Sequence, residues 1–346
     1  MRFVKKGTRA GHLAVSFGVT LLQRLSGLRC ASFYCRSIIL QFNLLPRSAQ
    51  NTANGGTTNL NTNLNMQTDK RTLLLPPCKI NIGLNVVARR ADGYHNLETV
   101  FYPVPLRDNL EFKISGDDTA PYTLATGGVP VAGDASDNLV VKVYMSLKKE
   151  FDLPPLDIYL YKHIPMGAGL GGGSSDAAMM MTGLNETFEL GMSEAEMEQR
   201  MASFGADCAF FVKCRPAYAT GIGDRLQPIS LSLKGKHIVL VKPDVFVSTK
   251  EAYAQVVPKP ADYPLIDAIA QPVTEWRRLV VNDFEASVFP NHPELAAIKQ
   301  TLYDMGAQYA AMSGSGSTIF GLFDRPVPEA AEVFDKHFVF VKQFVK

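Results

Sequence analysis

A glycine-rich run, PMGAGLGGGSSDAA at residues 165–178, is the part of this sequence best suited to bind a charged group. Five of the seven residues 167–173 are glycines, and a loop without side chains leaves its backbone N–H groups free to face an anion. Ser174, Ser175 and Asp176 follow, and the Ala/Met run after them predicts a helix whose N-terminus favours negative charge. We therefore interpret the run as a phosphate cradle.

Three familiar phosphate loops differ from this run. A P-loop requires Lys after its last glycine, and Ser174 stands there. Gly167, Gly169 and Gly172 match the dinucleotide-binding GxGxxG pattern, but the preceding strand alternates apolar and polar residues. In the dinucleotide-binding pattern, an acidic residue about 20 positions further on ends a second strand. Glu189 stands at about that position in this sequence, but it falls at a helix end instead. No HRD or DFG segment of a protein kinase follows. A plain glycine turn between a strand and a helix remains an alternative.

Metal-binding patterns are weak in this sequence. The five cysteines form no CxxC pair and no zinc-ligand spacing, and an odd count without a framework fits buried or idle thiols in a reducing compartment. Asp176, beside the predicted phosphate site, has two interpretations that the sequence leaves open. Its carboxylate either stabilises the first helical turn or contacts Mg²⁺.

The predicted elements place the glycine run between a strand at 156–162 and a helix from Ser174 to about Glu189. Further strands are predicted at 78–89, 98–104, 109–114, 238–243 and 318–323. Further helices are predicted at 137–151 with Asp137 as the N-cap, at 193–203 behind a Ser193–Glu196 capping box, and at 292–305. Because the order has no regular βαβαβ rhythm, it indicates an α+β fold.

The first 65 residues differ in composition from the rest. Before Asp69 the chain has eight Lys and Arg and no Asp or Glu, and residues 48–65 are an Asn/Thr/Gly tract that we expect to be disordered. Arg residues interrupt every apolar window in residues 13–42 that is long enough to span a bilayer. Three interpretations remain open: an over-extended reading frame with the real start at Met66, an organellar transit peptide, and a secretory signal.

Charge and composition limit the kinds of partner that we expect this protein to bind. The formal net charge of +2 is too small to indicate binding to nucleic acid or to an acidic membrane surface, and we expect neither partner. Hydrophobic residues make up 46% and charged residues 20%, which is ordinary for a globular enzyme. We expect a cytoplasmic location, or a plastid one if the leader is a transit peptide.

Three segments together resemble the motifs of the GHMP superfamily of small-molecule kinases, named after galactokinase, homoserine kinase, mevalonate kinase and phosphomevalonate kinase. They are CKINIGL at 78–84, the glycine run at 165–178 and SGSGSTIF at 313–320. The resemblance implies a two-lobed α+β fold with a ribosomal-protein-S5-like N-terminal lobe, a ferredoxin-like C-terminal lobe and the active site in the cleft between them. It divides the chain into a disordered extension, an ATP-binding kinase domain and a C-terminal GHMP kinase domain, at 1–66, 67–235 and 236–346.

Two further segments, RADGYHNLETVF at 90–101 and GADCAFFV at 205–212, resemble one branch of that superfamily. This branch acts on 4-diphosphocytidyl-2-C-methyl-D-erythritol in the non-mevalonate route to isoprenoids. The resemblance implies that ATP, with Mg²⁺, donates its γ-phosphate to the 2-hydroxyl of that substrate, and that the enzyme is a monomer or a homodimer. Two alternatives stay open. One is a kinase of homoserine or mevalonate, which would lack the Tyr94-His95 pair, and the other is a non-catalytic nucleotide-binding sensor on the same fold.

The same resemblance assigns the catalytic roles. Asp207 is expected to act as the base toward the alcohol. Lys79 is expected to hold Asp207 ionised and to offset charge at the attacking oxygen, while Asn81 orients the substrate. In the alternative interpretation, Lys79 and Asp207 form a structural ion pair, Asp207 caps the next helix and Asn81 ends a strand ladder.

Substrate recognition is assigned by resemblance as well. Tyr94 and Tyr253 are expected to sandwich the cytosine ring, His95 to read its edge, and Thr249 to meet the substrate. Tyr94 and His95 have the alternative of being surface turn residues.

The residues assigned to ATP are mostly those of the glycine run. They are Pro165, Met166, Gly167, Ala168, Gly169, Leu170, Gly171, Gly172, Gly173, Ser174 and Ser175. Asn138 and Lys162 are expected near the adenine, with a solvated surface position as the alternative, and no metal ligand is assigned. Pro77, Cys78 and Asp176 depart from the family's usual residues, but none of these departures removes a chemical group that the mechanism requires.

Removing residues 1–65 should leave folding and activity unchanged, because this segment has no core pattern and no motif. The measurement is the turnover and the solubility of the shortened chain beside those of the full chain. A shortened chain that aggregates, or that loses most of its turnover, would show that the leader belongs to the enzyme.

Overall fold

The fold begins with two long antiparallel strands. A computed structural model describes residues 71–345. Within it, β2 (Pro77–Arg89) and β3 (His95–Arg107) pair along nearly their whole length, with irregularities in register near Gly83 and at both ends. Two short strands extend this sheet to the order β2-β3-β7-β8, namely β7 (Ala217–Thr220) and β8 (Arg225–Pro228).

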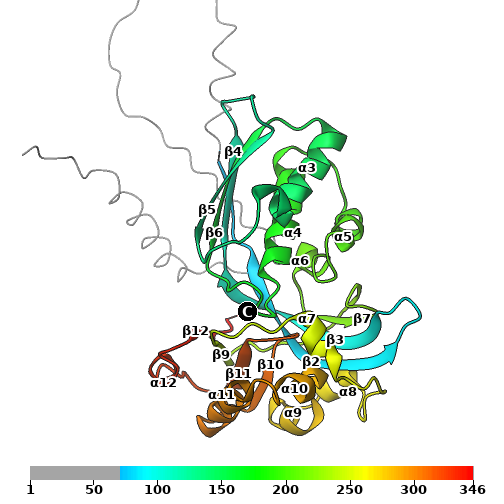
Figure 1. Cartoon of the computed structure of the whole chain (residues 1–346), viewed down its shortest axis with the longest axis vertical. Coiled ribbons are helices and arrows are strands. Elements are labelled where there is room, and N and C mark those ends of the chain that lie inside the picture. Colours follow the sequence, from blue (N-terminus) through cyan, green and yellow to red (C-terminus); the bar gives the residue numbers. More distant parts are fainter. Residues whose placement is uncertain (1–70, 346) are drawn as a thin grey trace, which may run out of the picture. The chain divides into compact units, whose positions relative to one another are not determined.

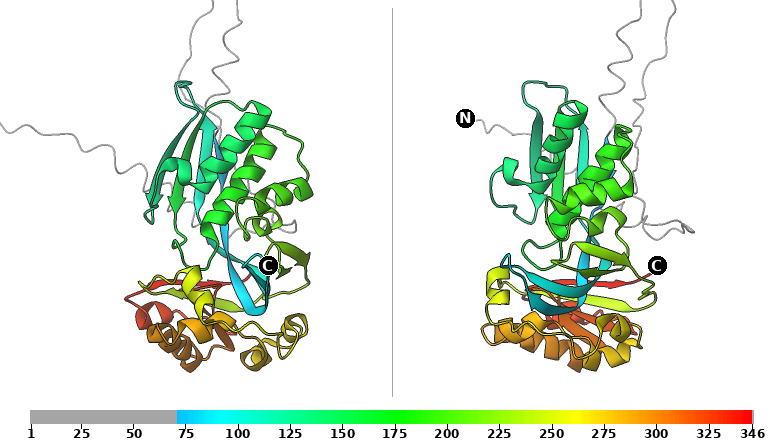
Figure 2. Two further views of the ribbon diagram at one scale, coloured as in Figure 1. Left: turned by 45° about the vertical axis from the view of Figure 1, so that its right-hand side comes forward. Right: turned by 90° about the vertical axis from the view of Figure 1, so that its right-hand side faces the viewer.

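A second sheet of the N-terminal half packs one face against helices α3 and α4, as Figures 1 and 2 show. Its strands, in the order β1-β4-β6-β5, are β1 (Thr72–Leu74), β4 (Asn109–Ile114), β6 (Leu156–Lys162) and β5 (Tyr122–Gly128). β5 and β6 are parallel, and their crossover runs through η1 (Ala135–Asp137) and α3 (Leu139–Phe151). The other helices here are α4 (Gly172–Thr187), α5 (Glu194–Ala202) and α6 (Phe210–Lys213).

The C-terminal half is built on an antiparallel sheet with the strand order β10-β11-β9-β12. Its strands are β9 (His237–Lys242), β10 (Tyr309–Met312), β11 (Ile319–Phe323) and β12 (Phe338–Gln343). This is the ferredoxin-like order, in which the first strand lies between the third and the fourth. Its helices are α7 (Thr249–Ala254), α8 (Leu265–Ile269), α9 (Val273–Leu279), α10 (Asp283–Val288), α11 (Pro293–Asp304) and α12 (Ala330–Val333).

The sheet that begins with β2 shares a core with the C-terminal sheet. Buried Ile80 and Val100 belong to the same apolar cluster as Leu240, Phe320 and Trp276. Successive residues of a strand point to opposite faces. The residues on either side of Ile80 are therefore presented on the opposite face of β2, where the glycine-rich loop lies.

The predicted α+β architecture is confirmed, and so are most of the predicted elements. β4 and β6 have the expected bounds, and the Ser193–Glu196 capping box is present. The predicted N-cap Asp137 is wrong: Asn138 caps α3, because its side chain accepts the N–H of Val140.

Two of the predictions, on the leader and on the domain division, are not tested by the described residues. The leader and its three interpretations lie outside the described residues, and the division at residues 235 and 236 stays a prediction. Among residues 71–345, no helix is long and apolar enough to cross a membrane.

Candidate active site

The glycine-rich loop connects β6 to α4 and needs glycine for two separate reasons. Gly169 and Gly171 have φ of +73° and +67°, a conformation that side chains disfavour. A side chain on Gly169 would also collide with the carbonyl oxygen of Ser313. A substitution at Gly169 would therefore push this loop away from the turn that carries Ser313.

A hollow of about 240 Å³ lies over this loop and the start of α4. Gly172, Gly173 and Ser174 line it, together with Leu139 at the start of α3. No side chain caps α4, so N–H groups of its first turn are available to an anion. A side chain on Gly173 would meet no atom within 4 Å, which shows that this position is open. The structure thus has the features of the predicted phosphate cradle.

Lys79 and Asp207 lie together, as predicted, with 3.1 Å between Nζ and Oδ2. The Lys79 side chain is 4% exposed, whereas that of Asp207 is 32% exposed and so reaches solvent. Lys79 Nζ also donates to Asn81 Oδ1 at 2.6 Å and to the carbonyl of Gly169 at 3.1 Å. One ammonium group therefore connects the predicted base to the glycine-rich loop. The cap of α6 is Ala209, and no side-chain cap is made there, so Asp207 does not cap that helix.

The turn after β10 completes this junction. Ser313 Oγ donates to the carbonyl of Gly169 at 2.9 Å and accepts the N–H of Asn81 at 3.2 Å. Asn282 Nδ2 donates to the carbonyls of Met312 and Gly314 at 2.8 and 2.9 Å, which holds the turn in place. All three motif segments thus meet at Gly169.

Two of the side chains assigned to the binding of cytosine lie against each other. The rings of His95 and Tyr253 stack with 4.8 Å between centroids and 18° between planes. Tyr94 beside them is 63% exposed, and Thr249 opens the short helix that carries Tyr253. Burial raises the pKa of Tyr253, and the negative charge of Asp207 raises it further, so this aromatic pair lies close to the predicted base. The His95 ring thus covers one face of the Tyr253 ring, and a nucleobase could stack on that face only if His95 moved away.

Lys162 occupies a place that the sequence did not indicate. Its side chain is 1% exposed, which excludes the surface alternative, and its ammonium bonds to Asp108 and, at 2.6 Å, to Asp176 Oδ2. Asn138 is half-buried at the start of α3. Whether either residue meets the adenine stays a prediction.

Asp176 is buried and paired, so it is not a free carboxylate at the first turn of α4. Burial raises its pKa to about 7, against the opposing effect of the Lys162 cation, and the nearby Asp108 carboxylate raises it further. Burial alone would lower the pKa of Lys162, but the two carboxylates outweigh that effect and raise it. The ammonium therefore stays charged.

Sequence reasoning missed three residues of this region, Asp108, Asn282 and Ser313. Ser313 stands within a motif that was recognised, so its role in packing was accessible. Asp108 is 54 residues from Lys162 and Asn282 is 30 from Met312, and no local pattern marks such distant partners.

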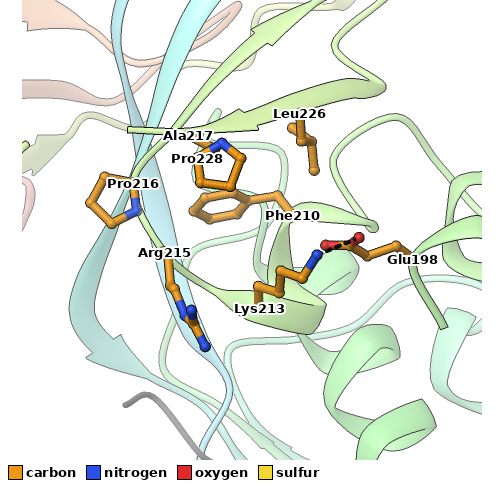
Figure 3. A pocket seen from close by; sticks show the side chains of 8 residues that line it. All are labelled: Glu198, Phe210, Lys213, Arg215, Pro216, Ala217, Leu226 and Pro228. Atoms are coloured by element: carbon orange, nitrogen blue, oxygen red, sulfur yellow. Dashed lines mark hydrogen bonds and ion pairs between the residues drawn. The ribbon is translucent and has the colours of Figure 1, made fainter. Parts of the chain in front are cut away.

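Other features of residues 71–345 offer less chemistry. No group of three or more His, Cys, Asp or Glu in that range is arranged to hold a metal ion. The three cysteines there are buried and form no disulfide, and burial raises the pKa of the Cys208 thiol to about 11. A separate hollow of about 140 Å³ lies between α5, α6 and β8 (Figure 3), but its Lys213 is engaged with Glu198 at 2.8 Å.

Comparison with known proteins agrees with this geometry. Residues 138–215 match the family described as GHMP kinases N terminal domain, and residues 265–339 match the one described as GHMP kinases C terminal. The chain is 55% identical over 251 residues to a 4-diphosphocytidyl-2-C-methyl-D-erythritol kinase of Bacteroides fragilis, covering 72% of this chain and 92% of the relative. It is 48% identical to that of Porphyromonas gingivalis, covering 76% and 96%.

Solved structures give the same result. The chain is similar to a crystal structure of 4-(cytidine 5'-diphospho)-2C-methyl-D-erythritol kinase, with a TM-score of 0.67, 31% identity, and coverage of 78% of this chain and 97% of the other. A mevalonate kinase from Methanococcus jannaschii matches with a TM-score of 0.57 and 12% identity, covering 79% and 98%. That second likeness shows the fold alone.

The raised pKa of Asp176 predicts a pH dependence of stability. In the folded state its carboxyl keeps a proton up to about pH 7, whereas in the unfolded chain it ionises near the ordinary aspartate pKa of 3.8. The folded state therefore binds more protons between these pH values, and the free energy of unfolding falls as pH rises through them. Between pH 5 and pH 7.5 we expect a loss of about 1–3 kcal/mol from this group.

In Asp176→Asn the free energy of unfolding should not show this fall between pH 5 and pH 7.5. Denaturant unfolding at several pH values measures it. The stability difference between the wild type and this variant should be smallest at high pH, because only the wild type loses stability as the Asp176 carboxyl ionises. Parallel slopes for the two proteins would contradict the assignment of the raised pKa to Asp176.

Proposed function

The chain belongs to the family of 4-diphosphocytidyl-2-C-methyl-D-erythritol kinases, within the GHMP kinases, and from that premise we propose how its residues carry the reaction. It is an ATP-dependent small-molecule kinase. We propose that it transfers the γ-phosphate of ATP to the 2-hydroxyl of 4-diphosphocytidyl-2-C-methyl-D-erythritol. The products are the 2-phosphate and ADP, in the methylerythritol phosphate route to isopentenyl diphosphate.

The ion pair of Lys79 and Asp207 is the observation that carries the mechanism. Asp207 takes the proton of the 2-hydroxyl as that oxygen attacks the γ-phosphorus, and the bond to the β-phosphate oxygen breaks to release ADP. Lys79, 3.1 Å away, favours the ionised carboxylate and offsets negative charge at the attacking oxygen. Its bond to the carbonyl of Gly169 keeps this pair in register with the phosphate loop.

ATP phosphates are proposed to lie in the hollow over residues 165–175, held by backbone N–H groups of the loop and the first turn of α4. Mg²⁺ is proposed to arrive with ATP and to neutralise charge on the β- and γ-phosphates. Such a site needs only one or two protein oxygens, because Mg²⁺ keeps its waters and phosphate ligands.

Recognition of the cytidine group is proposed to use the aromatic pair near Asp207. For Tyr253 to stack on cytosine, the His95 ring must leave its face, after which His95 is free to read the edge of the base. Tyr94, exposed beside it, would cover the other face, and Thr249 and Asn81 would contact the rest of the substrate. Homoserine and mevalonate contain no cytosine ring, so a kinase of either compound would not need such a site.

The small net charge favours no nucleic-acid or membrane partner, and we propose a cytoplasmic monomer or homodimer.

The protein should phosphorylate 4-diphosphocytidyl-2-C-methyl-D-erythritol and reject the uridine analogue, mevalonate and homoserine. Uracil has a carbonyl where cytosine has an amine, so a buried hydrogen bond would be left unmade, at about 1–3 kcal/mol per group. A coupled ADP-release assay on the four compounds measures this. Equal turnover of the cytidine and uridine compounds would overturn the cytosine site, and turnover of mevalonate alone would overturn the proposed substrate.

Asp207→Asn should lower kcat by about 10²–10⁴-fold, the usual contribution of a general base, while ATP binding survives. Lys79→Met should lower kcat as well, and the double variant should be little worse than the poorer single one because the two side chains act as a unit. Steady-state kinetics with ATP binding by calorimetry measure both effects. A near-normal kcat for Asp207→Asn with an intact fold would show that transfer needs no carboxylate base.

The control for this series must perturb the cradle and spare Lys79. Gly171 is unsuited, because a side chain there would lie 3.2 Å from Lys79 Cε. Gly173→Val is the better choice, since its side chain would enter open space in the hollow. It should weaken ATP binding and leave the Lys79–Asp207 pair in place.

A further inference from the structure

A buried cluster of one cation and two carboxylates lies beneath the phosphate loop. Lys162, at the end of β6, bonds to Asp108, between β3 and β4, and to Asp176, in the first turns of α4. The exposed fractions of the three side chains are 1%, 0% and 3%. Burial of a charge is costly, and an ion pair so deep is weak evidence for stability alone.

The cluster joins the two ends of the phosphate loop. Before the loop, Asp108 Oδ1 accepts the backbone N–H groups of His163 at 2.5 Å and Ile164 at 2.8 Å. After the loop, Asp176 binds Lys162 from within α4 at 2.6 Å. After Ile164 the chain runs through the phosphate loop, which lines the hollow. It contacts the cluster again at Asp176.

The cluster also lies close to the first residue of α4. A side chain on Gly172 would lie 3.3 Å from Lys162 Nζ and 2.9 Å from Ile164 Cγ2. The ammonium group is thus packed directly against the backbone that lines the hollow from the other side. The Lys162–Asp176 bond therefore ties the start of α4 to the end of β6.

We propose that Asp108, Lys162 and Asp176 form a positioning unit that fixes the separation of the two ends of the phosphate loop and so sets the fit of the cradle to the ATP phosphates. The unit acts through the loop, because all three side chains are buried and none of them lines the hollow. This inference rests on the proposed function, since it takes the loop to be the ATP site. It gives Lys162 an indirect role in ATP binding.

Asp176 offers the cleanest test. Asp176→Ala removes the bond between α4 and β6 but leaves Lys162 its second partner, Asp108, so no charge is left unpaired. Asp176→Asn keeps an oxygen that can accept from Lys162 and serves as the conservative variant. Asp157→Asn is the matched control: Asp157 is also on β6, but its ion pair with Lys113, 3.6 Å long, is partly exposed and far weaker.

The measurements are kcat, the KM for each substrate and calorimetric ATP binding, with thermal unfolding of each variant. Asp176→Ala should raise the KM and Kd for ATP about 10–100-fold, the range expected for losing a hydrogen bond to a charged group. Asp176→Asn should recover a large part of this loss. The KM for the acceptor should stay within about twofold, because its residues lie on β2, β3 and α7, and Asp157→Asn should change nothing.

A merely structural role predicts a different result. It would lower the unfolding temperature and the active fraction while the KM for ATP stayed normal, and that outcome would overturn the inference. If Asp176→Ala does not fold, Asp176→Ser, whose side chain is too short to make the same bond to Lys162, decides in the same way, and a normal ATP affinity in that variant would overturn the inference too. A wild-type protein that binds no ATP would instead reject the proposed function.

Discussion

The buried ammonium of Lys79 is the constraint on which the active site depends. A Lys side chain that is almost wholly removed from water needs partners on every side, because an unpaired buried charge is very unfavourable. Its partners come from three segments: Asp207, Asn81 beside it on β2, and the carbonyl of Gly169 in the phosphate loop. Satisfying one cation thus brings the proposed base, the side-chain amide of Asn81 and the glycine-rich loop together.

Close backbone contact makes this arrangement possible. The Gly169 carbonyl accepts both Lys79 Nζ and Ser313 Oγ, and a side chain at position 169 would collide with the Ser313 carbonyl. The loop must therefore be glycine where it meets the turn after β10, irrespective of what binds over it. Gly173 is different, since its side-chain direction is open space. The glycines of one run thus serve packing at one position and ligand access at another.

The sequence predicted the parts of this site that have local signals. β6 alternates cleanly and ends at a turn, and its bounds were predicted to the residue. β5 was missed because it is an edge strand rich in Thr and Gly, with few buried side chains. The N-cap of α3 was misplaced by one residue, since Asp137 and Asn138 are both good caps and only the three-dimensional contact distinguishes them. Asp108 has no local signature, and its importance appears only when three distant segments meet.

Two buried lysines lie on either side of the phosphate loop, and their surroundings suit different tasks. Lys79 has one carboxylate and otherwise neutral acceptors, and that carboxylate reaches solvent, so a substrate hydroxyl can approach it. Lys162 has two carboxylates, neither of which reaches solvent, so no substrate can exchange a proton with them directly. The same ion-pair chemistry therefore suits the proposed catalytic role where one partner is open to solvent, and the proposed positioning role where both partners are enclosed. Exposure of the acidic partner, more than its charge, separates the two roles.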